Sequence, residues 1–111
     1  MAINLLKESE LMQSAYDRFL KTLSNRTRLA IVQSLINESK NVTQLTEDLG
    51  IHQTSVSHAL KRLLDCGFVF VEKNGKERIY SVNKETIRPL MKLMEVHINS
   101  YCTRCVTGEE K

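Results

Sequence analysis

Residues 45–63 read Leu-Thr-Glu-Asp-Leu-Gly-Ile-His-Gln-Thr-Ser-Val-Ser-His-Ala-Leu-Lys-Arg-Leu, and their apolar spacing gives the clearest structural signal in the chain. The first half places two leucines on one helical face and ends at Gly50, because glycine adopts the left-handed conformation at low cost. From Val56 onward, apolar side chains again recur at helical spacing. We therefore expect a helix-turn-helix, a short helix and a turn followed by a second helix over about residues 53–65.

Two further helices are expected upstream. An amphipathic helix over about residues 5–23 carries apolar side chains at 4-3-4 spacing, at Met12, Tyr16, Phe19 and Leu23. Asn25 is expected to cap the next helix, because its side-chain oxygen can accept a hydrogen bond from a free backbone N–H of the first turn. The first helix of the helix-turn-helix is expected to start around Thr43.

Strand-forming residues follow the helix-turn-helix. Residues 68–71 and 78–82 are rich in β-branched and aromatic side chains. Between them, Asn74-Gly75 predicts a tight turn whose two central residues both have positive φ. We expect a β-hairpin with a charged tip over about residues 68–82.

The last helix is expected over about residues 84–105. Its apolar positions repeat at 4-3-4-3-4 spacing like a heptad seam, at Ile87, Met91, Met94, Ile98, Tyr101 and Cys105. A seam of this length is long for packing on one small domain. We therefore expect the helix to join two copies of the chain in a homodimer, with packing inside one chain as the alternative.

Length and composition define the class of protein. The chain of 111 residues fits a single domain, residues 1–111, and the expected fold is mainly α with a small β-hairpin. Hydrophobic residues make up 41% and charged residues 26%, which excludes a disordered or low-complexity chain. No apolar run is long enough for a membrane span and no signal-peptide pattern is visible, so we expect a cytoplasmic protein without a membrane partner.

The second helix of the helix-turn-helix is expected to contact double-stranded DNA. Residues 51–64 contain no acidic side chain, and the polar groups opposite the apolar stripe are of the types that contact phosphates and base edges. With basic residues of the helix capped by Asn25 and of the hairpin, the candidate DNA-binding residues are Arg28, Gln53, Thr54, Ser55, Ser57, His58, Lys61, Arg62, Lys73, Lys76 and Arg78. The alternatives are a solvated helix face and a module that contacts proteins only.

Three runs of the sequence carry a family resemblance. They are Leu-Ser-Asn-Arg-Thr-Arg-Leu-Ala-Ile-Val at 23–32, residues 45–63 as quoted above, and Cys-Gly-Phe-Val at 66–69, with Arg-Ile-Tyr-Ser-Val at 78–82 in addition. Together they resemble the ArsR/SmtB family of winged-helix repressors. The resemblance implies a homodimer built from the first and last helices, a recognition helix in the major groove and a wing near the minor groove. It also implies, for many members, release of DNA when a metal or metalloid binds.

The sequence departs from the family at its known sensor sites. Metal-sensing members often carry a Cys-Val-Cys motif before the recognition helix, where residues 41–45 here contain no thiol. Another family site uses Asp/His and His/Glu pairs along the last helix, and Glu85, Glu95 and His97 do not follow that pattern. Neither known arrangement carries over to this chain.

Cys102 and Cys105 remain as a candidate effector site. Their i,i+3 spacing puts both thiols on one helical face, where they can bind a thiophilic ion such as arsenite, cadmium or zinc, or form a disulfide. Two thiolates leave a metal site incomplete, so a third ligand would be Cys66, His97 or a cysteine of a second subunit. The sequence leaves metal sensing, thiol redox sensing and regulation without an effector open.

An enzyme is the contrasting class, namely a thiol–disulfide oxidoreductase that uses Cys102 and Cys105. The sequence argues against it, because redox Cys-x-x-Cys motifs lie at helix N-termini, where the helix dipole lowers the thiol pKa. Here the pair lies at the end of a long helix, where the dipole has the opposite sign. We therefore expect a regulator and no catalytic residues.

Overall fold

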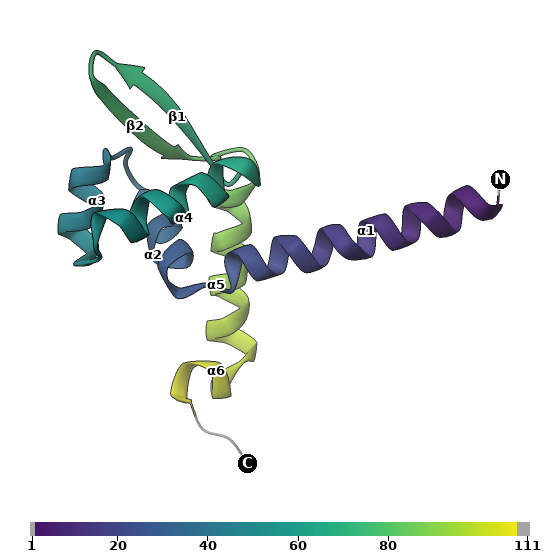
Figure 1. The fold of residues 1–111 in the computed structure, drawn as a ribbon. Coiled ribbons are helices and arrows are strands. Elements are labelled where there is room, and N and C mark those ends of the chain that lie inside the picture. Colours follow the sequence, from purple (N-terminus) through teal and green to yellow (C-terminus); the bar gives the residue numbers. More distant parts are fainter. Residues whose placement is uncertain (1, 109–111) are drawn as a thin grey trace.

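A computed structural model describes residues 2–108, with side chains from Glu8 onward. The elements in chain order are α1 (Ala2–Leu23), α2 (Arg26–Leu35), α3 (Val42–Leu49), α4 (Gln53–Asp65), β1 (Val69–Asn74), β2 (Glu77–Val82), α5 (Ile87–Tyr101) and α6 (Thr103–Thr107). The helices α2, α3 and α4 gather beside the hairpin, while α1 extends far out from this body as a single arm (Figure 1). The expectation of a mainly helical fold with a small hairpin is confirmed.

The core lies between α2, α3, α4 and the base of the hairpin. Its fully buried side chains are mostly aliphatic, with one aromatic ring at the start of the hairpin: Ile31, Val32, Leu35, Leu45, Val56, Leu60, Leu63, Phe68 and Val69. From α1, Phe19 stacks on Phe68 with ring centroids 5.0 Å apart. The body is therefore packed around the helix-turn-helix, and α1 joins it only through its C-terminal turns.

The ends of the core helices are capped by side chains. Asn25 accepts a hydrogen bond from the backbone N–H of Arg28, as predicted. α3 begins at Val42, one residue before the expected start at Thr43, and its N-cap Asn41 forms a reciprocal capping box with Gln44. An Asn followed three residues later by Gln is a known signal for this arrangement, so the sequence contained it. At the other end of α3, Gly50 adopts the expected left-handed conformation.

The hairpin turn differs from the expected one by one residue. Asn74 pairs with Glu77 across the two antiparallel strands, so Gly75 and Lys76 form the two-residue loop. Only glycines have positive φ within residues 2–108, and Gly75 has φ of 68°. Positive φ at the first central position alone is the type II′ pattern, and the prediction that both central residues have positive φ is wrong.

The hairpin is attached to the loop between α2 and α3. Lys40 and Tyr80 exchange two backbone hydrogen bonds of 3.0 and 2.8 Å in an isolated antiparallel bridge. Next to this bridge, the Asn41 amide donates a 2.9 Å hydrogen bond to the Glu77 carboxylate. Since Asn41 also caps α3, the first helix of the helix-turn-helix and the hairpin share one anchoring residue.

The helix expected over 84–105 is shorter and is interrupted. α5 begins at Ile87, and at Cys102 the backbone leaves the helical region with φ of −113° and ψ of 70° before α6 starts. The expected seam is also divided. Ile87 is buried and Met91 and Met94 pack partly against the core of their own chain. A second stripe, which the sequence analysis did not select, exposes Leu93 and Val96.

None of the helices in the described part of the chain has both the length and the apolar character that a membrane crossing requires.

Candidate nucleic-acid interface and thiol pair

The exposed face of α4 is the centre of the candidate interface. Val56, Ala59, Leu60 and Leu63 are buried, and the side chains between them face solvent. All seven candidates on this helix are exposed, namely Gln53, Thr54, Ser55, Ser57, His58, Lys61 and Arg62. The helix therefore presents hydroxyl, amide, imidazole and basic groups together and without an acidic side chain before Asp65.

A shallow open pocket of about 390 Å³ lies between the start of α2 and the first turns of α4. Its lining includes Thr54, Ser55 and His58 from α4 and Asn25, Thr27 and Arg28 from the start of α2. Backbone N–H groups at helix N-termini attract phosphate. The pocket thus places the N-terminus of α2 and polar side chains next to the exposed face of α4.

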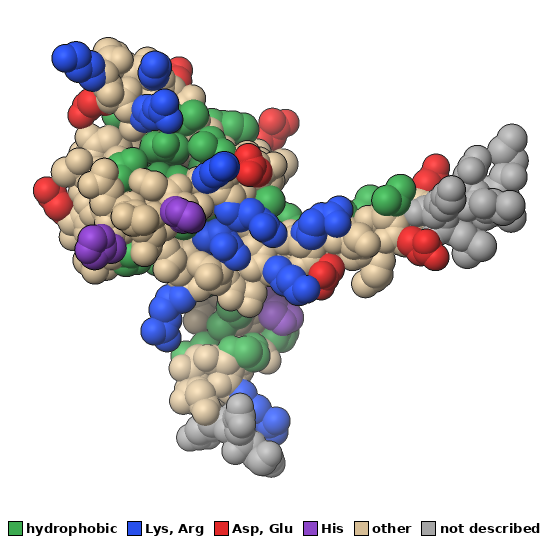
Figure 2. Space-filling view, viewed as in Figure 1, with side chains coloured by type: hydrophobic (Ala, Val, Ile, Leu, Met, Phe, Trp, Pro, Cys, Tyr) green, Lys and Arg blue, Asp and Glu red, His purple; other side chains and the backbone are tan. Residues whose placement is uncertain are grey.

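The hairpin extends the basic surface. Lys73, Lys76 and Arg78 are all exposed, and Glu72 and Glu77 lie among them. Figure 2 shows basic side chains at the tip of the hairpin and again near the junction of α4 with α1, on the same side of the molecule. The second group lies at the α1 end of α4, and the first lies at the hairpin tip.

Two of the candidate arginines bind α1 as well as facing outward. Arg28 is half-buried, and its Nε and Nη2 donate hydrogen bonds of 2.8 and 3.1 Å to the backbone oxygens of Thr22 and Lys21. Arg62 donates from Nε to the hydroxyl of Thr22 over 3.1 Å. Arg28 and Arg62 therefore differ from Lys61 in their contacts, because the Lys61 side chain has no hydrogen bond or ion pair to any described residue.

Thr22 is a residue that the sequence analysis missed. Its side chain is fully buried, and its Oγ1 also donates a 2.8 Å hydrogen bond to the Arg18 backbone oxygen. The Cys66 sulfur lies 3.6 Å from the same oxygen, at the C-terminal end of α4. A lone threonine between a lysine and a leucine gives no signal in one sequence, because its partner on α4 is 40 residues away.

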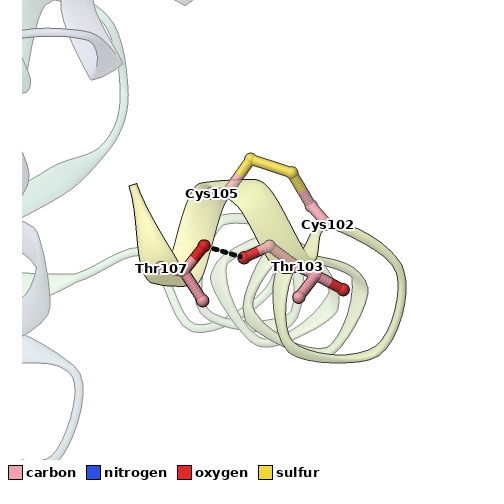
Figure 3. Close-up of a disulfide and its surroundings, with 4 residues drawn as sticks. All are labelled: Cys102, Thr103, Cys105 and Thr107. Carbon is pink, nitrogen blue, oxygen red and sulfur yellow. Dashed lines mark hydrogen bonds between the residues drawn. A yellow bond between two sulfur atoms is a disulfide. The ribbon is translucent and has the colours of Figure 1, made fainter. Parts of the chain in front are cut away.

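Cys102 and Cys105 form a disulfide at the junction of α5 and α6 (Figure 3), with Cα atoms 5.3 Å apart. The Cys105 backbone N–H donates to the Cys102 carbonyl over 3.0 Å, and the Thr107 hydroxyl donates to the Thr103 carbonyl over 3.1 Å. The two thiols lie next to each other, as the disulfide shows, but Cys102 is not helical, so the two residues do not share one helical face. Their placement at a helix junction, rather than within one continuous helix, was not predicted.

The proposed third ligands within one chain do not join this pair. Cys66 is a free, exposed thiol at the end of α4, beside Thr22. His97 is exposed, and its ring lies against the Tyr101 ring with the two ring centroids 5.4 Å apart. Among the residues that the structure describes, no group of three or more His, Cys, Asp or Glu side chains is arranged to hold a metal ion. Neither Cys66 nor His97 is grouped with the pair in the described residues, and the third ligand stays a prediction.

Comparisons with known proteins agree with this geometry. Residues 25–70 match the family model described as "Bacterial regulatory protein, arsR family". The chain is 33% identical to the arsenical resistance operon repressor of Bacillus subtilis over 76% of this chain and 80% of that protein. It is 34% identical to a probable mercury resistance operon repressor of Streptomyces lividans, over 68% of this chain and 61% of that protein. The chain thus spans about six tenths of the length of the second relative.

A solved structure shows the same fold. The homodimeric winged helix-turn-helix DNA-binding domain Mb0332 of Mycobacterium bovis superposes with a TM-score of 0.76. The match covers 93% of this chain and 92% of that domain at 21% sequence identity. The wing of that fold corresponds here to the hairpin of β1 and β2.

Proposed function

We propose that this chain, which belongs to the ArsR family of bacterial regulatory proteins, is a homodimeric DNA-binding transcriptional repressor that acts in the cytoplasm. The observation that carries the proposal is the acid-free exposed face of α4 beside a basic wing. The family consists of regulators and not of enzymes, so the oxidoreductase alternative is set aside.

In this proposal α4 enters the major groove and the wing contacts the neighbouring backbone. Gln53, Ser55, Ser57 and His58 read base edges, because amide, hydroxyl and imidazole groups can discriminate the donors and acceptors of the major groove. Lys61, Lys73, Lys76 and Arg78 bind phosphates. The phosphate contacts give affinity for any duplex, and the base contacts select the operator.

The dimer is proposed to form through α1 and α5. Both helices expose large apolar side chains, including Leu11, Met12, Tyr16 and Leu20 on α1 and Leu93 and Val96 on α5. A groove of about 1300 Å³ between α1, α2 and α5 is lined mainly by apolar groups such as Leu29, Ile36 and Met91. A second copy that covers these surfaces would remove apolar area from water, which favours association.

The effector site is proposed to be the Cys102–Cys105 pair. The pair closes as a disulfide at the end of α5, which supports a response to the thiol redox state. Binding of a thiophilic metal or metalloid by the reduced pair is the second candidate. It is supported by the names of the arsenical and mercury operon repressors to which the chain is similar. In either case chemistry at the C-terminal end of α5 would alter the dimer and the separation of the two α4 helices.

The test is fluorescence anisotropy on the DNA upstream of the protein's own gene. Reduced protein, oxidised protein, and reduced protein with arsenite, cadmium or zinc are compared with a Cys102→Ser/Cys105→Ser variant. Cys66→Ser serves as the matched control, since it removes a thiol outside the pair.

We expect reduced protein to bind, and one of the treatments to change the affinity in the wild type and in Cys66→Ser but not in the double variant. If the double variant loses only the response to oxidant, the result supports the redox site. If it loses only the response to one ion, the result supports the metal site. Equal affinity under every condition contradicts an effector role for the pair. Absence of binding at low salt contradicts the DNA-binding function itself.

A further inference from the structure

Thr22 is the one buried polar residue of the described side chains, and it lies where α1 meets α4. A threonine hydroxyl has one proton to donate and two lone pairs to accept with. Here the proton is committed to the Arg18 carbonyl of the same helix, so the oxygen accepts the Arg62 Nε–H. The direction of this hydrogen bond is thereby fixed, with Arg62 as the donor and Thr22 as the acceptor. It joins α4 to α1 and is charge-assisted.

The same end of α1 is held from α2. The last carbonyls of a helix have no partner inside the helix and carry partial negative charge. Arg28 satisfies two of them, those of Lys21 and Thr22, with one guanidinium group. We call Thr22, Arg28 and Arg62 the α1 clamp.

The clamp matters because α1 has few other attachments. Apart from the clamp, α1 meets the body through Phe19, which stacks on Phe68, and through buried Leu23, while Leu11, Met12, Tyr16 and Leu20 face solvent. These apolar contacts are non-directional, whereas hydrogen bonds constrain the angle between their partners. The polar contacts therefore add a directional constraint on the angle between α1 and α4.

We infer that Thr22, acting through Arg62, is a positioning residue that sets the orientation of the DNA-reading helix α4 relative to the dimer helix α1. The inference rests on the proposed function, in which α1 belongs to the dimer interface. In such a dimer the two α4 helices must lie about one helical turn of DNA apart, or about 34 Å. The clamp joins the C-terminal end of each α4 to the α1 of the same chain, and α1 belongs to the proposed dimer interface.

The test replaces the hydroxyl without changing charge or shape. Thr22→Val removes the acceptor for Arg62, together with the contact to the Cys66 sulfur, and leaves both arginines in place. Thr22→Ser is the control that keeps the hydroxyl. An encoded nitroxide-bearing residue in place of Ser57 reports the distance between the two α4 helices of the dimer by pulsed electron resonance, with all cysteines retained. Affinity and its salt dependence are measured in parallel on the DNA upstream of the protein's own gene, with the unlabelled variants.

We expect Thr22→Val to broaden the distance distribution, whereas wild type and Thr22→Ser give the same narrow one. Its DNA affinity should fall about tenfold, the size expected for one charge-assisted hydrogen bond. The salt slope should not change, because the number of phosphate contacts is the same. Rescue by serine distinguishes positioning from a general loss of packing.

Three outcomes overturn the inference. One is an unchanged distribution and affinity in Thr22→Val. Another is loss of the dimer or of helical content in this variant, which would assign Thr22 a purely structural role. The third is an equal defect in Thr22→Ser. A wild type that shows no distance between two labels contradicts the homodimer of the proposed function. An unlabelled wild-type dimer that does not bind DNA contradicts its DNA-binding part, while the distances between the labels still test the clamp.

Discussion

The helix-turn-helix body buries its large apolar side chains, whereas the arm α1 exposes several of its own. In the body, Ile31, Leu45 and Leu63 are fully buried. On α1, Leu11 is 67% exposed and Tyr16 59% exposed. Figure 1 shows the same contrast in shape, with a gathered body and a helix that extends away from it.

This difference indicates which part of the molecule is complete by itself. A domain of this size has little apolar area to bury, and exposed apolar patches on a protein surface commonly mark an interface. The body holds its core, caps and wing anchor within one chain. In the proposed dimer a second copy covers the arm and the outer stripe of α5, so the body should respond to mutation as a folding unit and the arm as an interface.

The largest effect is expected in the body. Phe68→Ala should lower the free energy of unfolding by about 3–5 kcal/mol, because it leaves a cavity in the core and removes the ring on which Phe19 stacks. Phe70→Ala is the matched control, since Phe70 is 54% exposed. Urea unfolding at one fixed protein concentration measures both. Equal losses in the two variants would contradict the location of the core.

The next effect separates the interface from the fold. Leu93→Glu introduces a charge into the exposed stripe of α5 and should weaken the dimer about a hundredfold, because a buried unpaired charge is costly. Helical content of the monomer should remain. Sedimentation and circular dichroism measure the two properties. Thr43→Glu, which adds the same charge to an exposed position of α3, should leave the dimer intact, and a dimer that survives Leu93→Glu would place the interface elsewhere.

A third prediction compares neighbouring basic residues of α4. Lys61→Gln should lower the slope of log affinity against log salt by about 2 for a dimer, because two phosphate contacts are lost. Arg62→Lys keeps the charge but cannot reproduce the guanidinium contact with Thr22, so its slope should stay the same while its affinity falls. Anisotropy titrations at several salt concentrations give both values. A wild-type slope for Lys61→Gln would refute the phosphate role of Lys61.

The smallest effect concerns the residue that the body shares with its wing. Asn41→Ala should cost about 1 kcal/mol of stability through loss of the N-cap of α3. It should also release the wing from Glu77, which hydrogen exchange at β2 would detect. Ser39→Ala removes an exposed polar side chain outside any helix and should change neither property. Unchanged exchange at β2 in Asn41→Ala would show that the hydrogen bond from Asn41 to Glu77 does not hold the wing.

Local features of the fold were predictable from the sequence, and long-range contacts were not. The polar face of α4, the cap at Asn25 and the left-handed Gly50 follow from nearest neighbours along the chain. The turn at Gly75 was displaced by one residue because the strand register depends on pairing along the whole hairpin. The hydrogen bond from Arg62 to Thr22 and the bridge between Lys40 and Tyr80 each join segments about 40 residues apart. No local sequence pattern encodes such contacts.

The candidate site divides in the same way. The exposure of the α4 candidates could be predicted, since it follows from helical periodicity. The attachment of Arg28 and Arg62 to α1 could not, because a basic side chain looks the same in sequence whether it faces a phosphate or a carbonyl oxygen. Likewise, the spacing of Cys102 and Cys105 predicted that their thiols lie close enough for a disulfide, while their separation from Cys66 depends on the tertiary fold.

The attachment of α1 by its last turns makes this helix a lever. Its 22 residues span about 33 Å at 1.5 Å per residue. A rotation of about 10° at the clamp therefore moves the far end of such a rod by about 6 Å. Conversely, a looseness of about 1 Å where a partner grips the far end corresponds to only about 2° at α4. In the proposed dimer, a displacement of α1 in the interface is therefore reduced to a small change of angle at α4.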